Sequence, residues 1–73
     1  MLTIANNIRK IRKEKGLTQV QVSKATGFTQ SRVAEYETER YKPENITLGA
    51  AINLANALGC TLDELFTAEE QAE

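Results

Sequence analysis

Residues 18–37, TQVQVSKATGFTQSRVAEYE, carry the strongest structural signal in this chain of 73 residues. Thr18 and Thr29 each precede a short helical pattern, and a threonine hydroxyl there can accept a hydrogen bond from a free backbone N–H of the first turn. The run Thr18–Gln21 also matches a capping box. Gly27 lies between the two patterns, where a residue that tolerates positive φ permits a tight turn. The stretch therefore predicts two short helices joined by a turn.

The second of these helices, expected over residues 29–38, is apolar on one side only. Its other side is short and polar, and glutamine and glutamate can hydrogen-bond to base edges in the major groove of DNA. A helix-turn-helix is a scaffold that places its second helix in that groove. We therefore expect binding to double-stranded DNA, with base contacts from Gln30, Ser31, Ala34 and Glu35.

The net charge of −1 is unevenly distributed along the chain. All nine Lys and Arg lie in residues 9–42, together with four of the ten acidic residues, so this part carries a formal charge of +5 and residues 43–73 carry −6. The asymmetry is consistent with an uneven solvated surface or with a phosphate-facing N-terminal half, and the motif favours the second interpretation.

Several residue types are scarce or absent. We find no apolar run of about 18 residues and no leader segment, so we expect no membrane association. A single Cys60 and no histidine predict a cytoplasmic protein without an internal disulfide, metal site or cofactor. No nucleophile and base pair is evident, so we do not expect an enzyme. Cys60 itself is expected to be a small core residue.

The spacing of apolar residues and the helix start and stop signals predict five helices in one domain, residues 1–67. A polar tail, residues 68–73, is expected to follow and to fray. The first helix is expected over residues 4–15, capped by Thr3 and ended by Gly16. The fourth runs from Thr47 to the residue before Gly59, with Asn45 as a rival cap. The fifth opens with a second capping box, residues 61–64.

Three segments and two small residues resemble the Cro and phage-repressor type of helix-turn-helix domain, the XRE family. They are IRKIRKEKGLTQ (8–19), Ser23 and Gly27, TQSRVAEYE (29–37) and ALGCTLDELF (57–66). The resemblance covers residues 8–66. It implies an all-α, compact five-helix, lambda-repressor-like domain with the helix-turn-helix at helices 2 and 3. Such domains are usually sequence-specific regulators of transcription and often bind DNA as a symmetric dimer.

The resemblance also implies roles for individual residues. Arg12 and Glu37 match a pair that forms an internal salt bridge, and a carboxylate at the C-terminal end of a helix independently calls for a nearby cation. Thr26 and Glu39 depart from the family pattern, which has leucine and often glycine there. The positions that contact the DNA backbone correspond to Gln19, Arg32, Arg40 and Lys42.

The resulting prediction is a stand-alone DNA-binding transcriptional regulator, a repressor or a switch between repression and activation. Its control would come from concentration, homodimer formation or a regulatory protein partner. Leu54, Leu65 and Phe66 are the candidate dimer surface. The alternative is a protein-interaction module, such as an antitoxin-like or anti-regulator partner, that keeps the fold without reading DNA. Binding to random duplex DNA distinguishes the two functions.

Overall fold

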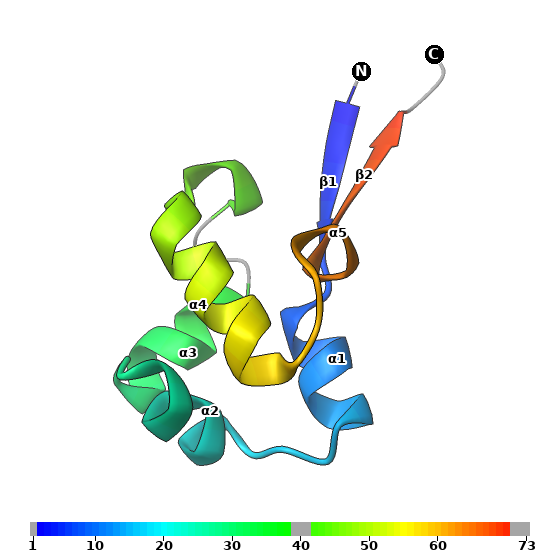
Figure 1. Cartoon of the computed structure of the whole chain (residues 1–73). Coiled ribbons are helices and arrows are strands. Elements are labelled where there is room, and N and C mark those ends of the chain that lie inside the picture. The colour runs from blue at the N-terminus through cyan, green and yellow to red at the C-terminus, as the bar shows by residue number, and fades with distance from the viewer. Residues whose placement is uncertain (1, 39–41, 71–73) are drawn as a thin grey trace.

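The computed structural model describes residues 2–38 and 42–70. It contains five α-helices, a 3₁₀ turn and a two-stranded sheet (Figure 1). The expected helical architecture is confirmed, with a small sheet added to it. In chain order the elements are β1 (Leu2–Asn6), α1 (Ile8–Glu14), α2 (Gln19–Thr26), α3 (Gln30–Glu37), η1 (Pro43–Asn45), α4 (Leu48–Leu58), α5 (Leu62–Leu65) and β2 (Phe66–Glu70).

The predicted helix starts are confirmed for the last four α-helices. Thr18 and Gln21 form both bonds of the expected capping box at α2, and the Thr29 hydroxyl accepts from the backbone N–H of Arg32 at α3. Thr47, rather than Asn45, caps α4, because Asn45 is part of η1. Thr61 and Glu64 form the capping box of α5. Each cap satisfies backbone N–H groups that have no partner inside the helix.

The start of the first helix was predicted wrongly. Residues 2–6 form β1 instead of a helical turn capped by Thr3, and α1 begins at Ile8. Asn6 supplies the reason, because its side chain accepts a hydrogen bond from the Ile8 N–H (3.0 Å) and donates to the carbonyl oxygen of Tyr36 (2.7 Å). These two bonds hold the chain at the junction between strand and helix.

The frayed tail expected over residues 68–73 is corrected for residues 68–70, and residues 71–73 lie outside the described residues. Residues 66–70 form β2, which pairs antiparallel with β1 so that Ile4 lies opposite Ala68. Asn7 fixes this arrangement, since its side-chain amide donates to the carbonyl oxygen of Glu64 and to the Thr67 hydroxyl. The two strands extend side by side from the helical body (Figure 1).

The core lies between the helices, with α4 contributing more buried residues than any other described element. Leu54 and Leu65 are 0% exposed, so these two residues cannot form the predicted dimer surface in the folded chain. Leu54 on α4 and Leu65 on α5 each lie on the apolar side of their helix that packs into the core. Phe66 is partly buried and packs against the same core. The buried apolar residues are Ile8, Val22, Val33, Tyr36, Ala50, Ala51, Leu54, Ala55, Leu58 and Leu65.

The described helices are all too short or too polar to span a lipid bilayer.

Candidate nucleic-acid interface

The turn between α2 and α3 is held by a set of polar contacts. Gly27 adopts φ of 80°, the left-handed conformation expected from the sequence. The Ser23 hydroxyl donates to the carbonyl oxygen of Phe28, and the Thr26 hydroxyl donates to that of Val22 and accepts from the Phe28 N–H. Thr26, at the position where the family has leucine, thus stabilises the turn through hydrogen bonds. The side chain of Asn53 donates to the Thr26 carbonyl oxygen at 2.7 Å and so ties the turn to α4.

The two sides of α3 differ as the sequence predicts. Val33, Tyr36 and Glu37 are buried against the domain. The side chains of Gln30 and Ser31 are exposed, and those of Ala34 and Glu35 are partly exposed. All four residues predicted to contact bases therefore lie on the side of α3 that faces away from the core.

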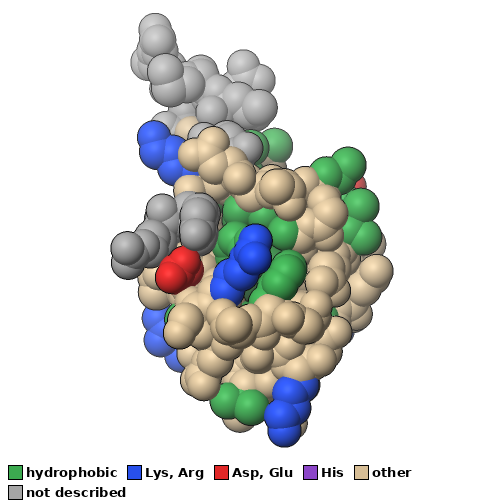
Figure 2. All heavy atoms as spheres, turned by 90° about the vertical axis from the view of Figure 1, so that its left-hand side faces the viewer, with side chains coloured by type: hydrophobic (Ala, Val, Ile, Leu, Met, Phe, Trp, Pro, Cys, Tyr) green, Lys and Arg blue, Asp and Glu red, His purple; other side chains and the backbone are tan. Residues whose placement is uncertain are grey.

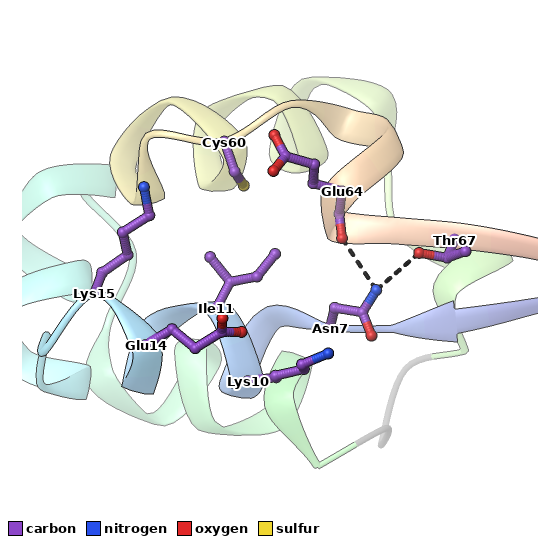
Figure 3. A pocket seen from close by; sticks show the side chains of 8 residues that line it. All are labelled: Asn7, Lys10, Ile11, Glu14, Lys15, Cys60, Glu64 and Thr67. Atoms are coloured by element: carbon purple, nitrogen blue, oxygen red, sulfur yellow. Dashed lines mark hydrogen bonds between the residues drawn. The ribbon is translucent and has the colours of Figure 1, made fainter.

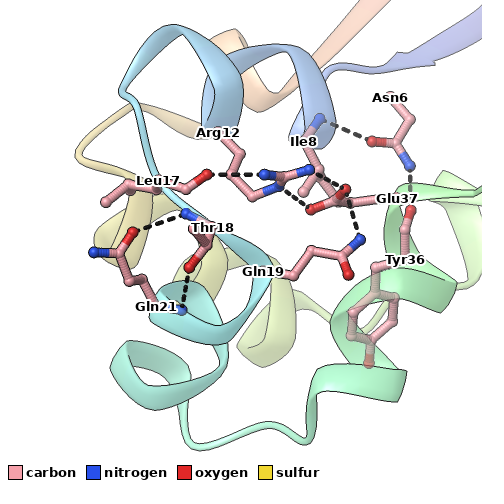
Figure 4. A network of polar contacts seen from close by, with 9 residues as sticks. All are labelled: Asn6, Ile8, Arg12, Leu17, Thr18, Gln19, Gln21, Tyr36 and Glu37. Atoms are coloured by element: carbon pink, nitrogen blue, oxygen red, sulfur yellow. Dashed lines mark hydrogen bonds and ion pairs between the residues drawn. The ribbon is translucent and has the colours of Figure 1, made fainter.

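Arg12 and Glu37 form the predicted salt bridge (Figure 4). The Nε and Nη2 groups of Arg12 donate to the two carboxylate oxygens of Glu37 at 2.6 and 3.1 Å, and Nη1 donates to the carbonyl oxygen of Leu17 at 2.8 Å. A two-pronged Arg–carboxylate pair fixes both position and angle. The pair therefore joins α1, the segment before α2, and the C-terminal end of α3.

Gln19, predicted to contact a phosphate, belongs to the same network (Figure 4). It is the first residue of α2, and its side-chain amide donates to Glu37 Oε1 at 3.3 Å. The carboxylate of Glu37 thus accepts hydrogen bonds from both α1 and α2. This contact holds the Gln19 side chain beside the N-terminus of α2, where backbone N–H groups and the helix dipole favour an anion.

Two of the other predicted phosphate-contacting residues are described. Lys42 is exposed and has extended backbone angles, as expected before Pro43. Arg32 is exposed, and its guanidinium lies against the rings of Phe28 and Tyr36. Arg40, together with Glu39, lies outside the described residues. Figure 2 shows the face on the left of Figure 1, where one basic side chain lies across hydrophobic side chains near the centre.

Sequence reasoning did not identify Phe28 and Tyr36 as neighbours of Arg32. A signal was available for Tyr36, because residues four apart on a helix are neighbours on its surface. Phe28 was expected only to fill the core between α2 and α3, and it does pack against the core.

Two basic residues, Lys10 of α1 and Lys15 just after it, line a groove instead of facing α3. Lys10 and Lys15 line a groove of about 300 Å³ between α1 and α5, which Glu14 and Glu64 also line (Figure 3). Acidic side chains there offset part of the positive charge of the N-terminal half. The charge asymmetry along the sequence therefore overstates the positive charge available to a ligand at α3.

Cys60 lies in the same groove (Figure 3). Burial raises the pKa of its thiol above the ordinary value, and the nearby Glu64 carboxylate raises it further, whereas Lys15 lowers it. The pKa of Glu64 is lowered by hydrogen bonds from the backbone N–H and the hydroxyl of Thr61. The sequence predicts a buried core residue, whereas Cys60 is only partly buried and packs against the core from its edge.

The fold and the arrangement of α2 and α3 define the class of protein. A family model described as "Helix-turn-helix" matches residues 8–65, and the chain belongs to this XRE-type family of DNA-binding regulators. The family predicted from the sequence is thereby confirmed.

Individual relatives agree with this class. The chain is 39% identical over 77 residues to an immunity repressor protein of Bacillus phage phi105, covering 99% of this chain and 51% of that protein. It thus spans about half the length of this relative. It is 38% identical over 68 residues to an uncharacterized HTH-type transcriptional regulator, y4dJ, of Sinorhizobium fredii, covering 93% of this chain and 84% of that protein.

A solved structure has the same fold. The restriction-modification controller protein C.AhdI from Aeromonas hydrophila superposes with a TM-score of 0.73 at 32% sequence identity, over 82% of this chain and 86% of that one.

Proposed function

We propose that this protein is a cytoplasmic repressor of transcription that inserts α3 into the major groove of a specific duplex DNA sequence. The observation that carries the proposal is the division of α3 into two sides. Val33, Tyr36 and Glu37 fix one side to the domain. The opposite side presents amide, hydroxyl, methyl and carboxylate groups at Gln30, Ser31, Ala34 and Glu35. These are the groups that distinguish base pairs by their major-groove edges.

Contacts to the sugar-phosphate backbone set the affinity and the register of α3 in the groove. Gln19 and the N-terminus of α2 are suited to one strand. Arg32 is suited to a phosphate on the other side of α3, and the exposed Lys42 is a further candidate. Arg40 stays a candidate from the sequence alone. Because Glu37 connects Gln19 to Arg12, the angle between α2 and α3 is held before DNA is bound. Such preorganisation reduces the entropy lost on binding.

We further propose that two copies bind together, because one helix in one groove reads only a few base pairs. Leu48 and Ile52, four residues apart on α4, are 68% and 43% exposed and so lie together on one face of that helix. They replace the buried Leu54 and Leu65 as candidate dimer residues. Beside Leu48 lies an apolar groove of about 310 Å³, lined also by Ile4, Pro43, Ile46, Ala51, Leu62, Asp63 and Phe66.

The decisive experiment measures duplex DNA binding by fluorescence anisotropy at several salt concentrations, followed by selection of bound sites from a random pool. We expect binding that weakens steeply with salt, because counterions are released from the phosphates. We also expect selection to enrich a palindromic site. Salt-insensitive or undetectable binding at low ionic strength would favour the alternative, a protein-interaction module with a regulatory protein as its partner.

A further inference from the structure

The guanidinium of Arg32 is held by two aromatic residues. Its central carbon lies 5.0 Å from the centre of the Phe28 ring and 5.6 Å from that of the Tyr36 ring. Its Nε donates a hydrogen bond to the Tyr36 hydroxyl at 2.9 Å. The two rings meet edge to face, with centres 5.8 Å apart and planes at 61°. A cation within about 6 Å of a ring centre is attracted to the ring face.

These contacts order a side chain that would otherwise be flexible. A long arginine side chain has many rotamers in solution and loses that freedom when it binds a ligand. Phe28 and Tyr36 are themselves anchored, since Tyr36 is buried and Phe28 packs against the core. Arg32 is therefore ordered in the free protein, although the residue is exposed.

The position of Arg32 on α3 separates it from the four residues predicted to contact bases. At 3.6 residues per turn, Arg32 lies on the flank between the outward Ser31 and Glu35 and the buried Tyr36. Glu37, which contacts Gln19, lies on the opposite flank. A helix in the major groove has one phosphate strand along each flank. With α3 in a major groove, as proposed above, Arg32 would face one strand and Gln19, through its contact with Glu37, the other.

We propose that Phe28 and Tyr36 are positioning residues that hold Arg32 as a preformed phosphate contact. The inference rests on the proposed DNA-binding function and deepens it. The planar guanidinium fork matches a phosphate group, and the Tyr36 hydroxyl accepts from the Nε donor of that fork. Arg32 therefore contributes to affinity for any duplex and does not select bases.

A double-mutant cycle tests the coupling between Phe28 and Arg32. Anisotropy with a random duplex is measured for wild type, Phe28→Leu, Arg32→Ala and the double variant, each corrected for the folded fraction by circular dichroism. We expect Phe28→Leu to weaken binding about two- to fivefold in wild type, the loss of one exposed cation–π contact. In the Arg32→Ala background it should have no further effect. Arg32→Ala should lower the salt slope by about one unit.

Two further variants keep the test decisive. Phe28→Tyr keeps an aromatic face and should restore wild-type affinity and salt slope. If Phe28→Leu does not fold, Tyr36→Phe, which removes only the hydroxyl, takes its place in the cycle.

Equal losses from Phe28→Leu in both backgrounds would overturn the inference, because a purely structural role affects both alike. An unchanged salt slope in Arg32→Ala would also overturn it. A wild-type protein that does not bind DNA would instead refute the proposed function.

Discussion

The carboxylate of Glu37 meets the guanidinium of Arg12 through two hydrogen bonds, although only 1% of the Glu37 side chain and 11% of the Arg12 side chain are exposed. Among the described residues, Glu37 is the buried charged residue. It lies at the C-terminal end of α3, where the helix dipole disfavours a negative charge. Burying the Glu37 carboxylate carries a desolvation penalty. Hydrogen bonds from Arg12 and Gln19 offset that penalty.

Removing one partner of this pair should destabilise the domain strongly. Arg12→Ala or Glu37→Ala leaves a buried charge without its partner, which costs about 3–5 kcal/mol. That is a large part of the free energy of unfolding of a small domain. The midpoints of urea denaturation measure the loss.

The double variant Arg12→Met/Glu37→Leu should be much more stable than either single variant, because it removes both charges and keeps apolar volume. Lys13→Ala, at an exposed neighbouring position, is the control and should leave the midpoint unchanged. Single variants with wild-type midpoints would contradict a stabilising role for the pair.

Local chemistry explains how much of the fold the sequence could predict. Thr18, Thr29, Thr47 and Thr61 each cap a helix, because capping depends on residues a few positions apart. The Arg12–Glu37 pair was also predictable, from the family and from the dipole argument. The caps need no knowledge of distant parts of the chain, whereas Arg12 and Glu37 are 25 positions apart and their pairing was predictable mainly through the family.

The features that were missed depend on contacts between distant segments. Strands β1 and β2 stabilise each other by pairing. The alternation of apolar and polar residues in LTIAN, residues 2–6, is too short to predict that pairing. Periodicity alone could not tell whether Leu54 faces the core or a partner, since both surfaces are apolar. The aromatic contacts of Arg32 arise only when α3 is packed against the turn that carries Phe28.

The stability of the domain should depend on pH through Glu64. Its folded-state pKa lies below the ordinary value of 4.5, because Thr61 donates hydrogen bonds to the ionised carboxylate. A lowered pKa contributes stability that is present above 4.5 and is lost as the pH falls through the folded-state value. Glu64→Gln should therefore be less stable than wild type at pH 6, and the difference should shrink below pH 4.

Thermal unfolding from pH 2.5 to 7 measures this difference. Thr61→Ala keeps the backbone N–H donor and loses the hydroxyl, so it should retain only part of the pH dependence. A wild-type advantage over Glu64→Gln that is constant across this range would rule out the contribution of the ionised carboxylate.

The reactivity of Cys60 should respond in opposite directions to its two charged neighbours. Burial and Glu64 raise the pKa of the thiol, and Lys15 lowers it. Because the thiolate is the nucleophile, the pH profile of iodoacetamide alkylation should shift to lower pH in Glu64→Gln and to higher pH in Lys15→Ala. The three profiles should coincide in concentrated urea. Native profiles that also coincide would show that neither charge reaches the sulfur.

Dimer formation should depend on the exposed apolar residues of α4. We expect wild type to associate with rising concentration in sedimentation velocity, and Leu48→Glu or Ile52→Glu to remain monomeric because a charge is then buried in the contact. Val20→Glu on α2 is a matched control, since Val20 and Ile52 are both 43% exposed. It should associate like wild type. Association that survives Ile52→Glu and Leu48→Glu would place the dimer surface elsewhere.

Base selection should depend on the outward side of α3. Gln30 lies in the first turn of that helix, and its amide can pair with adenine through two hydrogen bonds. Gln30→Ala should lose about 1–3 kcal/mol at one base position of each half-site and leave binding to random duplexes nearly unchanged. Glu35 can accept a hydrogen bond from cytosine, so Glu35→Gln should relax the preference at its own position. It should also tighten binding overall, because a negative charge near the phosphates is removed.

Neither change should shift the denaturation midpoint, since Gln30 is exposed and Glu35 lies on the same side of α3, away from the core. Lys42→Ala is the contrasting control, because loss of a phosphate contact weakens binding to all sequences alike and lowers the salt slope by about one unit. Selection from a random pool compares the base preferences of the variants with those of wild type. If Gln30→Ala and Glu35→Gln select the wild-type site without change, α3 is not the helix that reads the sequence.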